Sequence, residues 1–238
     1  MDLAALLFDL DGTLAHTDPL HFLAWQDALA EHGVEVDEAA YARHVSGRHN
    51  PQIVADLLPH LTESQGRAFA EAKEARFRAA AGDLEPLPGV HEVLRAARRA
   101  GLATALVTNA PRDNTLFMLR ALGLQDAFDA IGLGDEAAAP KPDPAPYRET
   151  LRRLGVEADR ALAFEDSPSG VTSARGAGVP VVGLTTTQRP DALTDAGASL
   201  VVDDFLDARL WSGSGPLAGL APYRDDRQHH DPDGASDA

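Results

Sequence analysis

The sequence of 238 residues contains no cysteine, which excludes disulfide bonds, thiolate catalysis and cysteine-ligated zinc sites. It also lacks any apolar run that approaches the roughly 20 residues of a membrane-spanning helix. The opening segment, residues 1–12, has neither a basic start nor a long apolar stretch, so it does not resemble a signal peptide. We therefore expect a cytoplasmic protein without a membrane partner.

Positive charge is scarce. The chain has 21 Lys and Arg against 37 Asp and Glu, a formal net charge of −16. Because so acidic a surface repels nucleic acid, we expect no nucleic-acid partner. Any site for an anionic ligand must then supply its own local positive charge. Only Lys73 and Lys141 are lysines, which draws attention to those two positions.

Short apolar runs alternate with amphipathic segments over much of the chain. Strands that are buried on both faces of a parallel sheet have this nearly unbroken apolar character. The alternation predicts an α/β fold with a doubly wound parallel sheet. The expected strands are Ala4–Phe8, Leu102–Val107, Ala161–Phe164, Val179–Leu184 and Ser199–Val202, and the expected helices are Val90–Arg99, Arg112–Leu122, Tyr147–Leu154 and Ser169–Ala177.

A block of helical patterns interrupts this alternation after the first strand. It predicts an all-α cap over residues 17–85, inserted into a core formed by residues 1–16 and 86–222. Residues 223–238 are polar and have no apolar period, so we expect a disordered tail there. The expected cap helices are Pro19–Glu31, Asp37–Val45, Pro51–Leu58 and Glu63–Ala81.

The strongest motif is the segment Phe8–Leu14, which closes the first strand. Asp9 and Asp11 are two residues apart, so their side chains share one face at the carboxyl end of the strand, where open α/β sheets bind ligands. One carboxylate can attack phosphorus while the other serves as acid and then base. The simpler alternative is a strand end followed by an ordinary Asp-Gly turn. The whole heptad on an apolar strand favours chemistry.

Three further motifs follow other strands or loops. Taken alone, each has a structural explanation, as a helix cap, an incidental loop lysine or a pair of N-terminal helix acids. Taken as site residues, they would supply neutral and cationic phosphate contacts and oxygen ligands for a hard cation. They are Thr108 with Asn109, Lys141 between Pro140 and Pro142, and Glu165 with Asp166.

Together these motifs put too much negative charge in one place. Four carboxylates and a phosphate dianion repel one another strongly unless cations offset them. Mg²⁺ and Lys141 are the natural compensation, since magnesium prefers a few carboxylates with phosphate oxygen and water. The same repulsion predicts a raised pKa for Asp11, which would let it hold a proton for the leaving group.

The ordered set of motifs resembles the haloacid dehalogenase superfamily of aspartyl-phosphate phosphotransferases, over essentially residues 1–210. The resemblance implies that Asp9 is the nucleophile and Asp11 the general acid and base. It implies that the phosphate is held by Thr108, Asn109 and Lys141. It also implies that Mg²⁺ is bound by Asp9, the backbone carbonyl of Asp11, Asp166 and, as a further candidate, Glu165.

The cap resembles that of the β-phosphoglucomutase-like branch, in the segments Leu20–Trp25, Ser46–Arg48 and Lys73–Phe77. A cap of this kind closes over the site and excludes water. Without a role in binding, His21 would be a helix histidine with its hydrogen bonds satisfied, Arg48 a solvated loop residue and Lys73 an exposed helix residue. The substrate contacts that the resemblance implies are His21, Trp25, Gly47, Arg48 and Lys73.

Mutase and phosphatase differ in whether a sugar hydroxyl or water attacks the aspartyl phosphate. Thr13 and the Thr108–Asn109 pair are more similar to the sugar-phosphate phosphatases of the branch. We therefore expect a magnesium-dependent phosphatase of a small phosphorylated metabolite, a sugar phosphate, with β-phosphoglucomutase as the alternative. A dehalogenase needs neither the metal nor Asp11, and a phosphoreceiver module has no use for a cap. The absence of heptads and the acidic surface favour a monomer.

Overall fold

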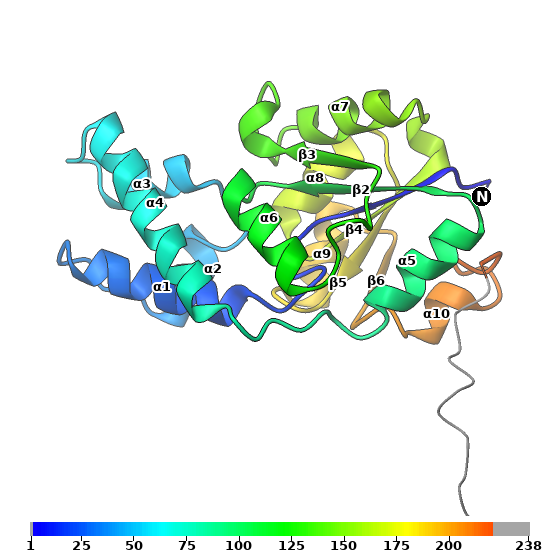
Figure 1. Cartoon of the computed structure of the whole chain (residues 1–238), viewed down its shortest axis with the longest axis horizontal. Helices are drawn as coiled ribbons and strands as arrows, with labels where there is room; N and C mark the ends of the chain where they lie inside the picture. The colour runs from blue at the N-terminus through cyan, green and yellow to red at the C-terminus, as the bar shows by residue number, and fades with distance from the viewer. Residues whose placement is uncertain (1, 221–238) are drawn as a thin grey trace, which may run out of the picture.

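A parallel sheet with the strand order β3-β2-β1-β4-β5-β6 forms the centre of the computed structural model, which describes residues 2–220 (Figure 1). In register, Phe8 of β1 lies beside Leu106 of β2 and Phe164 of β4. Strands β2 and β3 are added on one side of β1, and β4, β5 and β6 on the other. The ends of β1, β2 and β4 therefore form the switch point of a doubly wound sheet. The strands are β1 (Ala5–Phe8), β2 (Ala103–Thr108), β3 (Ala130–Leu133), β4 (Ala161–Glu165), β5 (Val181–Leu184) and β6 (Leu200–Val202).

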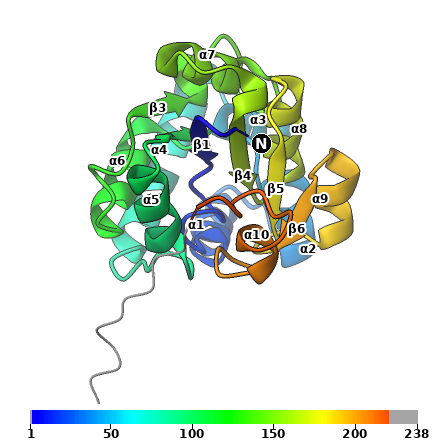
Figure 2. The same cartoon turned by 90° about the vertical axis from the view of Figure 1, so that its right-hand side faces the viewer.

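Helices cover both faces of the sheet (Figure 2). Leu6 and Phe8 of β1 pack in one core with α5, α6 and α10, whereas Ala5 and Leu7 pack in the other with α7, α8 and α9. Successive strand residues point to opposite faces, so a strand covered on both sides must be apolar throughout. The helices are α5 (Val90–Arg99), α6 (Arg112–Ala121), α7 (Ala145–Leu154), α8 (Pro168–Gly176), α9 (Pro190–Ala196) and α10 (Ala208–Trp211).

Four helices leave the sheet between β1 and α5 and gather at one end of the molecule (Figure 1). They enclose an apolar cluster of their own that includes Trp25, Tyr41 and Phe69. The predicted helical insertion is therefore confirmed, and we call these four helices the cap; its boundaries at residues 17 and 85 stay a prediction. The helices are α1 (Asp18–Ala30), α2 (Glu38–His44), α3 (Asn50–Leu57) and α4 (Glu63–Ala80).

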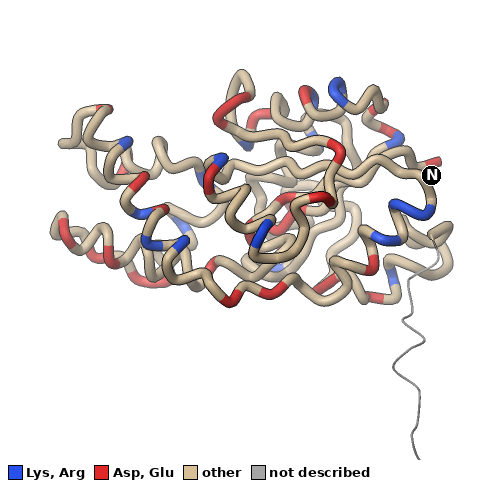
Figure 3. The backbone as a smooth tube through the Cα atoms, in the orientation of Figure 1, with Lys and Arg blue, Asp and Glu red and all other residues tan. Residues whose placement is uncertain are grey.

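The predicted fold class is confirmed, with a few elements missed. The edge strand β3 was not predicted, because four residues that include a glycine carry little periodic signal. The helices α9 and α10 were missed because seven and four residues span too few turns to show a helical period. The predicted tail at residues 223–238 lies outside the described residues. Within residues 2–220, no helix is long and apolar enough to cross a membrane. Acidic positions are spread over both the cap and the sheet region (Figure 3).

Candidate active site

A cavity of about 90 Å³ lies at the carboxyl edge of the central strands, between the sheet and the cap. Asp9 follows β1, Thr108 ends β2, and Asp166 follows β4, so the level ends of three neighbouring strands supply its floor. The predicted site residues that line it are Asp9, Asp11, His21, Trp25, Gly47, Arg48, Lys73, Thr108, Asn109, Lys141 and Asp166.

Lys141 is the cation of the cavity floor. Its buried ammonium donates to Asp9 Oδ1 and to Glu165 Oε1, each at 2.6 Å. Burial alone lowers the pKa of Lys141, but the charges of these two carboxylates outweigh burial and raise it. The Asn109 side chain holds the Lys141 backbone from both sides, since its Nδ2 donates to the carbonyl at 3.1 Å and its Oδ1 accepts from the amide at 3.0 Å. Asn109 therefore positions Lys141.

Asp9, Glu165 and Asp166 form a buried acidic cluster whose nearest carboxylate oxygens all lie within 4.8 Å of one another. Glu165 does not line the cavity but lies directly behind it, where its Oε1 also accepts from the Tyr147 hydroxyl at 2.5 Å. Burial raises the pKa of all three carboxyls, for Glu165 to about 7, against the lowering effect of Lys141.

The cluster fits a divalent cation. Among the described residues, Glu165 Oε2 is the buried side-chain oxygen without a hydrogen-bond partner. A buried polar atom of this kind is costly unless something satisfies it. Three converging carboxylate oxygens are a suitable donor set for a hard, oxygen-binding ion. The structure thus supports a divalent metal site at Asp9, Glu165 and Asp166, and Asp11 is not part of the cluster.

Gly12 lets the turn after β1 close on this cluster. Its φ is +75°, and a Cβ atom at this position would overlap the Asp166 carboxylate. Asp166 also accepts from the Thr187 hydroxyl at 2.5 Å and from Thr13 Oγ1 at 3.4 Å. Sequence analysis missed Thr187 and Tyr147 as site residues. Thr187 lies just beyond β5, so the rule that ligands bind at the carboxyl edge could have found it.

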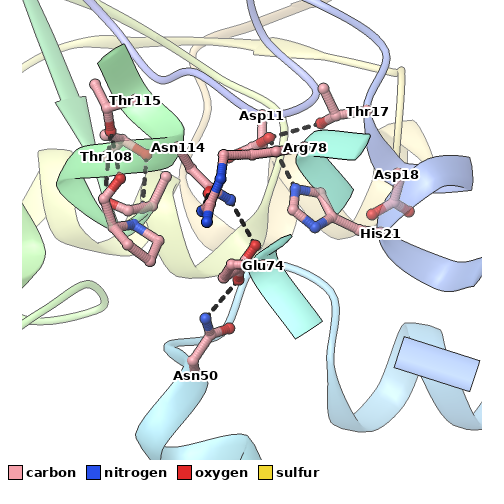
Figure 4. A network of polar contacts seen from close by, with 12 residues as sticks. Asp11, Thr17, Asp18, His21, Asn50, Glu74, Arg78, Thr108, Asn114 and Thr115 are labelled. Atoms are coloured by element: carbon pink, nitrogen blue, oxygen red, sulfur yellow. Dashed lines mark hydrogen bonds and ion pairs between the residues drawn. The ribbon is translucent and has the colours of Figure 1, made fainter. Parts of the chain in front are cut away.

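Asp11 faces the cap. Its Oδ1 accepts from Thr17 Oγ1 at 2.8 Å and lies 3.1 Å from His21 Nε2 (Figure 4). The predicted rise in the pKa of Asp11 is wrong. Burial does raise it, but His21 and the Thr17 hydroxyl, which hydrogen-bond to its carboxylate, outweigh burial and lower the pKa. The sequence could not show that Lys141 engages Asp9 while cap residues engage Asp11.

His21 and Lys73 lie together in the cavity. Lys73 Nζ is 2.9 Å from His21 Nδ1, and the His21 ring stacks on Phe77 at 3.9 Å between centroids. Because an ammonium can only donate, Nδ1 accepts and Nε2 carries the hydrogen toward Asp11. Trp25 packs against Lys73, whose ammonium lies 4.9 Å from the centroid of the Trp25 ring.

The loop of Gly47 and Arg48 contacts the core. A Cβ atom at Gly47, whose φ is +69°, would come within 3.0 Å of the Ser167 Cβ. Arg48 lines the cavity, but its guanidinium donates to the His44 carbonyl at 2.8 Å and to Asp56 at 2.6 Å. The guanidinium therefore binds within the cap, and nothing in its contacts singles out a substrate.

Glu74 is a cavity residue that sequence analysis did not identify. It is buried; its Oε1 accepts from Lys73 at 2.9 Å and from Asn50 at 2.5 Å, and its Oε2 accepts from Asn114 of α6 at 2.5 Å (Figure 4). Asn114 in turn accepts from Arg78 at 2.5 Å. The Glu74 carboxylate thus joins two cap helices to the core. A Lys-Glu pair on a polar helix gives no sequence signal for this.

Comparisons with known proteins agree on one family. The family model for haloacid dehalogenase-like hydrolases matches residues 3–178. A phosphoglycolate phosphatase of Rhodospirillum rubrum is 39% identical over 88% of this chain and 90% of its own length. A phosphorylated carbohydrates phosphatase of Thermotoga maritima is 33% identical over 83% of this chain and 93% of its own length.

A solved structure shares the whole architecture. The crystal structure of a CbbY mutant from Rhodobacter sphaeroides, in complex with xylulose-1,5-bisphosphate, superposes with a TM-score of 0.79 at 32% identity. The match covers 92% of this chain and 99% of the other. It includes the sheet and the helical insertion alike.

Proposed function

The chain belongs to the haloacid dehalogenase-like hydrolases and is a phosphatase of that family, and we propose that it hydrolyses a sugar phosphate with Mg²⁺ through an aspartyl-phosphate on Asp9. The observation that carries the proposal is the convergence of Asp9, Asp11, Lys141 and Asp166 on one cavity. Relatives named as phosphatases support hydrolysis over the transfer to a second hydroxyl that a β-phosphoglucomutase performs.

Asp9 is the proposed nucleophile. Lys141 binds Asp9 Oδ1, so Oδ2 is the oxygen that would attack phosphorus. As the new O–P bond forms, the bond from phosphorus to the leaving oxygen breaks, and that oxygen takes a proton from Asp11. Asp11 has to gain this proton in the substrate complex, because His21 and Thr17 outweigh burial and lower its pKa in this structure. Water then attacks phosphorus, gives its proton to Asp11, and the bond to Asp9 breaks to release inorganic phosphate.

Other side chains would position the phosphoryl group. Thr108 Oγ1 accepts from the Ala110 amide at 2.9 Å, so the hydroxyl keeps its own hydrogen for donation to a phosphate oxygen. We propose that Lys141 contacts the same group and that Asn109 acts through Lys141. His21, whose Nε2 faces Asp11, would orient that carboxyl for proton transfer.

Mg²⁺ is the proposed cofactor. Asp9, Asp166 and the backbone carbonyl of Asp11 would hold it, with Glu165 as a further ligand, on the strength of the clustered oxygens and the unsatisfied Glu165 Oε2. When bound, the ion supplies positive charge to offset that of the phosphoryl oxygens.

The proposal is tested by phosphate release from a panel of sugar phosphates and short-chain phosphate esters, with Mg²⁺ and with EDTA. We expect release with Mg²⁺ and none with EDTA. β-Glucose 1-phosphate belongs in the panel, with formation of glucose 6-phosphate followed separately. Isomerisation much faster than phosphate release would overturn hydrolysis as the main reaction.

A further inference from the structure

The far wall of the cavity is formed by the cap and by α6, opposite the acidic cluster. Glu74, Asn50 and Asn114 lie there and are joined by hydrogen bonds through the Glu74 carboxylate (Figure 4). We propose that this wall binds a hydroxyl group, so that the substrate is a phosphate monoester with a neutral, hydroxylated tail and without a second anionic group. The inference rests on the proposed function and specifies its substrate class.

The Lys73 charge is already neutralised. Its ammonium and the Glu74 carboxylate are 2.9 Å apart, and the two residues are 1% and 4% exposed. A second phosphate or carboxylate beside Lys73 would therefore meet Glu74 at nearly the same distance, in surroundings that screen charge poorly. Attraction to Lys73 would be cancelled by repulsion from Glu74.

Glu74 retains capacity for one more donor. A carboxylate offers about four acceptor sites. Lys73 and Asn50 use two on Oε1, and Asn114 uses one on Oε2. A substrate hydroxyl can donate to the remaining site, whereas a phosphate or carboxylate oxygen has no hydrogen to give.

The other cap cations do not compensate. Arg48 pairs with Asp56, and Arg78 does not line the cavity. The lining as a whole carries five carboxylates against three cationic side chains, so even with the two charges of the proposed Mg²⁺ it has no net positive charge for a second phosphate. The carboxylates are Asp9, Asp11, Asp18, Glu74 and Asp166, and the cations are Arg48, Lys73 and Lys141.

The wild-type enzyme gives the first test. We compare kcat/KM for substrates matched except for the second group: glycerol 3-phosphate with 3-phosphoglycerate, and fructose 6-phosphate with fructose 1,6-bisphosphate. We expect the hydroxylated monophosphate of each pair to be preferred by about tenfold or more, which corresponds to about 1.4 kcal/mol. A preference for 3-phosphoglycerate and for fructose 1,6-bisphosphate over their partners overturns the inference.

Substitution of Glu74 gives the second test. Glu74→Gln removes the negative charge and frees Lys73 to bind a second anionic group. The ratio of kcat/KM for the hydroxylated substrate to that for its carboxylate or bisphosphate partner should therefore fall by about tenfold. Glu71→Gln, an exposed change of the same kind on α4, should leave the preference unchanged. If Glu74→Gln lowers the rates for all substrates equally, Glu74 is only structural and the inference is wrong.

The failure of this inference can be told from that of the proposed function. An enzyme that hydrolyses esters but prefers those with two anionic groups contradicts the inference alone. An enzyme that hydrolyses none of them contradicts the proposed function. In that case the rise in unfolding temperature that each ligand of a pair produces still decides which class the wall binds.

Discussion

Lys141 and Lys73 lie in one cavity, on opposite walls, under different electrostatic conditions. Lys141, from the core, donates to the carboxylates of Asp9 and Glu165, and they raise its pKa despite complete burial. Lys73, from the cap, is paired with a single carboxylate, and burial lowers its pKa despite that pairing. The number of carboxylates within hydrogen-bond distance thus separates two equally buried lysines.

The difference separates two tasks. The core wall concentrates opposite charges where a phosphoryl group and a divalent ion would bind. The cap wall uses its lysine to hold His21 and Glu74, and so presents a nearly neutral surface. We infer that the core wall supports the chemistry and the cap wall selects the substrate.

Removal of Lys141 should have the larger effect. Lys141→Ala leaves Asp9 and Glu165 buried without their cation, and we expect kcat to fall by about 10³-fold. Without Mg²⁺ the variant should also unfold at a lower temperature than the wild type, and more so at pH 8 than at pH 6, because protons can neutralise the carboxyls at the lower pH. Initial rates and thermal unfolding in EDTA measure both effects. Arg43→Ala, an exposed cap substitution, is the control.

Removal of Lys73 should have a smaller effect. Lys73→Met keeps most of the side-chain volume but takes the donor from His21 Nδ1, so the tautomer that faces Asp11 is no longer fixed. We expect kcat/KM to fall by about 10- to 100-fold. Steady-state kinetics with the best substrate of the panel measure it. A loss as large as that of Lys141→Ala would remove the distinction between the two walls.

The pH dependence of magnesium binding should show the smallest effect. The pKa of Asp9, Glu165 and Asp166 is raised, for Glu165 to about 7, so the folded, metal-free protein retains protons that the unfolded chain releases. The contribution of Glu165 to stability therefore falls as pH rises from about 4.5 to about 7, that of Asp9 and Asp166 falls as pH rises above about 3.8, and metal must displace the remaining protons. The rise in unfolding temperature on adding Mg²⁺ should be greater at pH 8 than at pH 6. An equal rise at both values would show that these carboxyls do not titrate with the metal.

Much of the core wall could be predicted from the sequence because most of its residues end or follow an apolar strand, while Lys141 stood out by its flanking prolines. The rule that parallel strands end at one edge brings Asp9, Thr108 and Asp166 together without knowledge of any contact. Tyr147 was not predicted as a site residue, because the apolar pattern of its helix already accounted for it.

The cap wall was predicted only in part. His21, Lys73 and Arg48 came from a resemblance, and their partners did not. The contact of Glu74 with Asn114 has no periodic signal, since it depends on how helices far apart in sequence meet. The ion pair of Arg48 with Asp56 and the contact of Asp11 with His21 depend on how a loop folds back on the next helix, which the sequence pattern does not show. For that reason the sequence suggested the wrong direction for the pKa of Asp11.

The role of Asp9 is tested most directly by acid-quenching the enzyme during turnover and mapping the phosphorylated peptide. We expect phosphate on Asp9 in the wild type. Asp9→Asn should yield no phosphopeptide and should lose at least about 10³-fold in rate, while the exposed control Asp195→Asn retains both. Phosphate on another residue, or normal turnover by Asp9→Asn, would contradict the account.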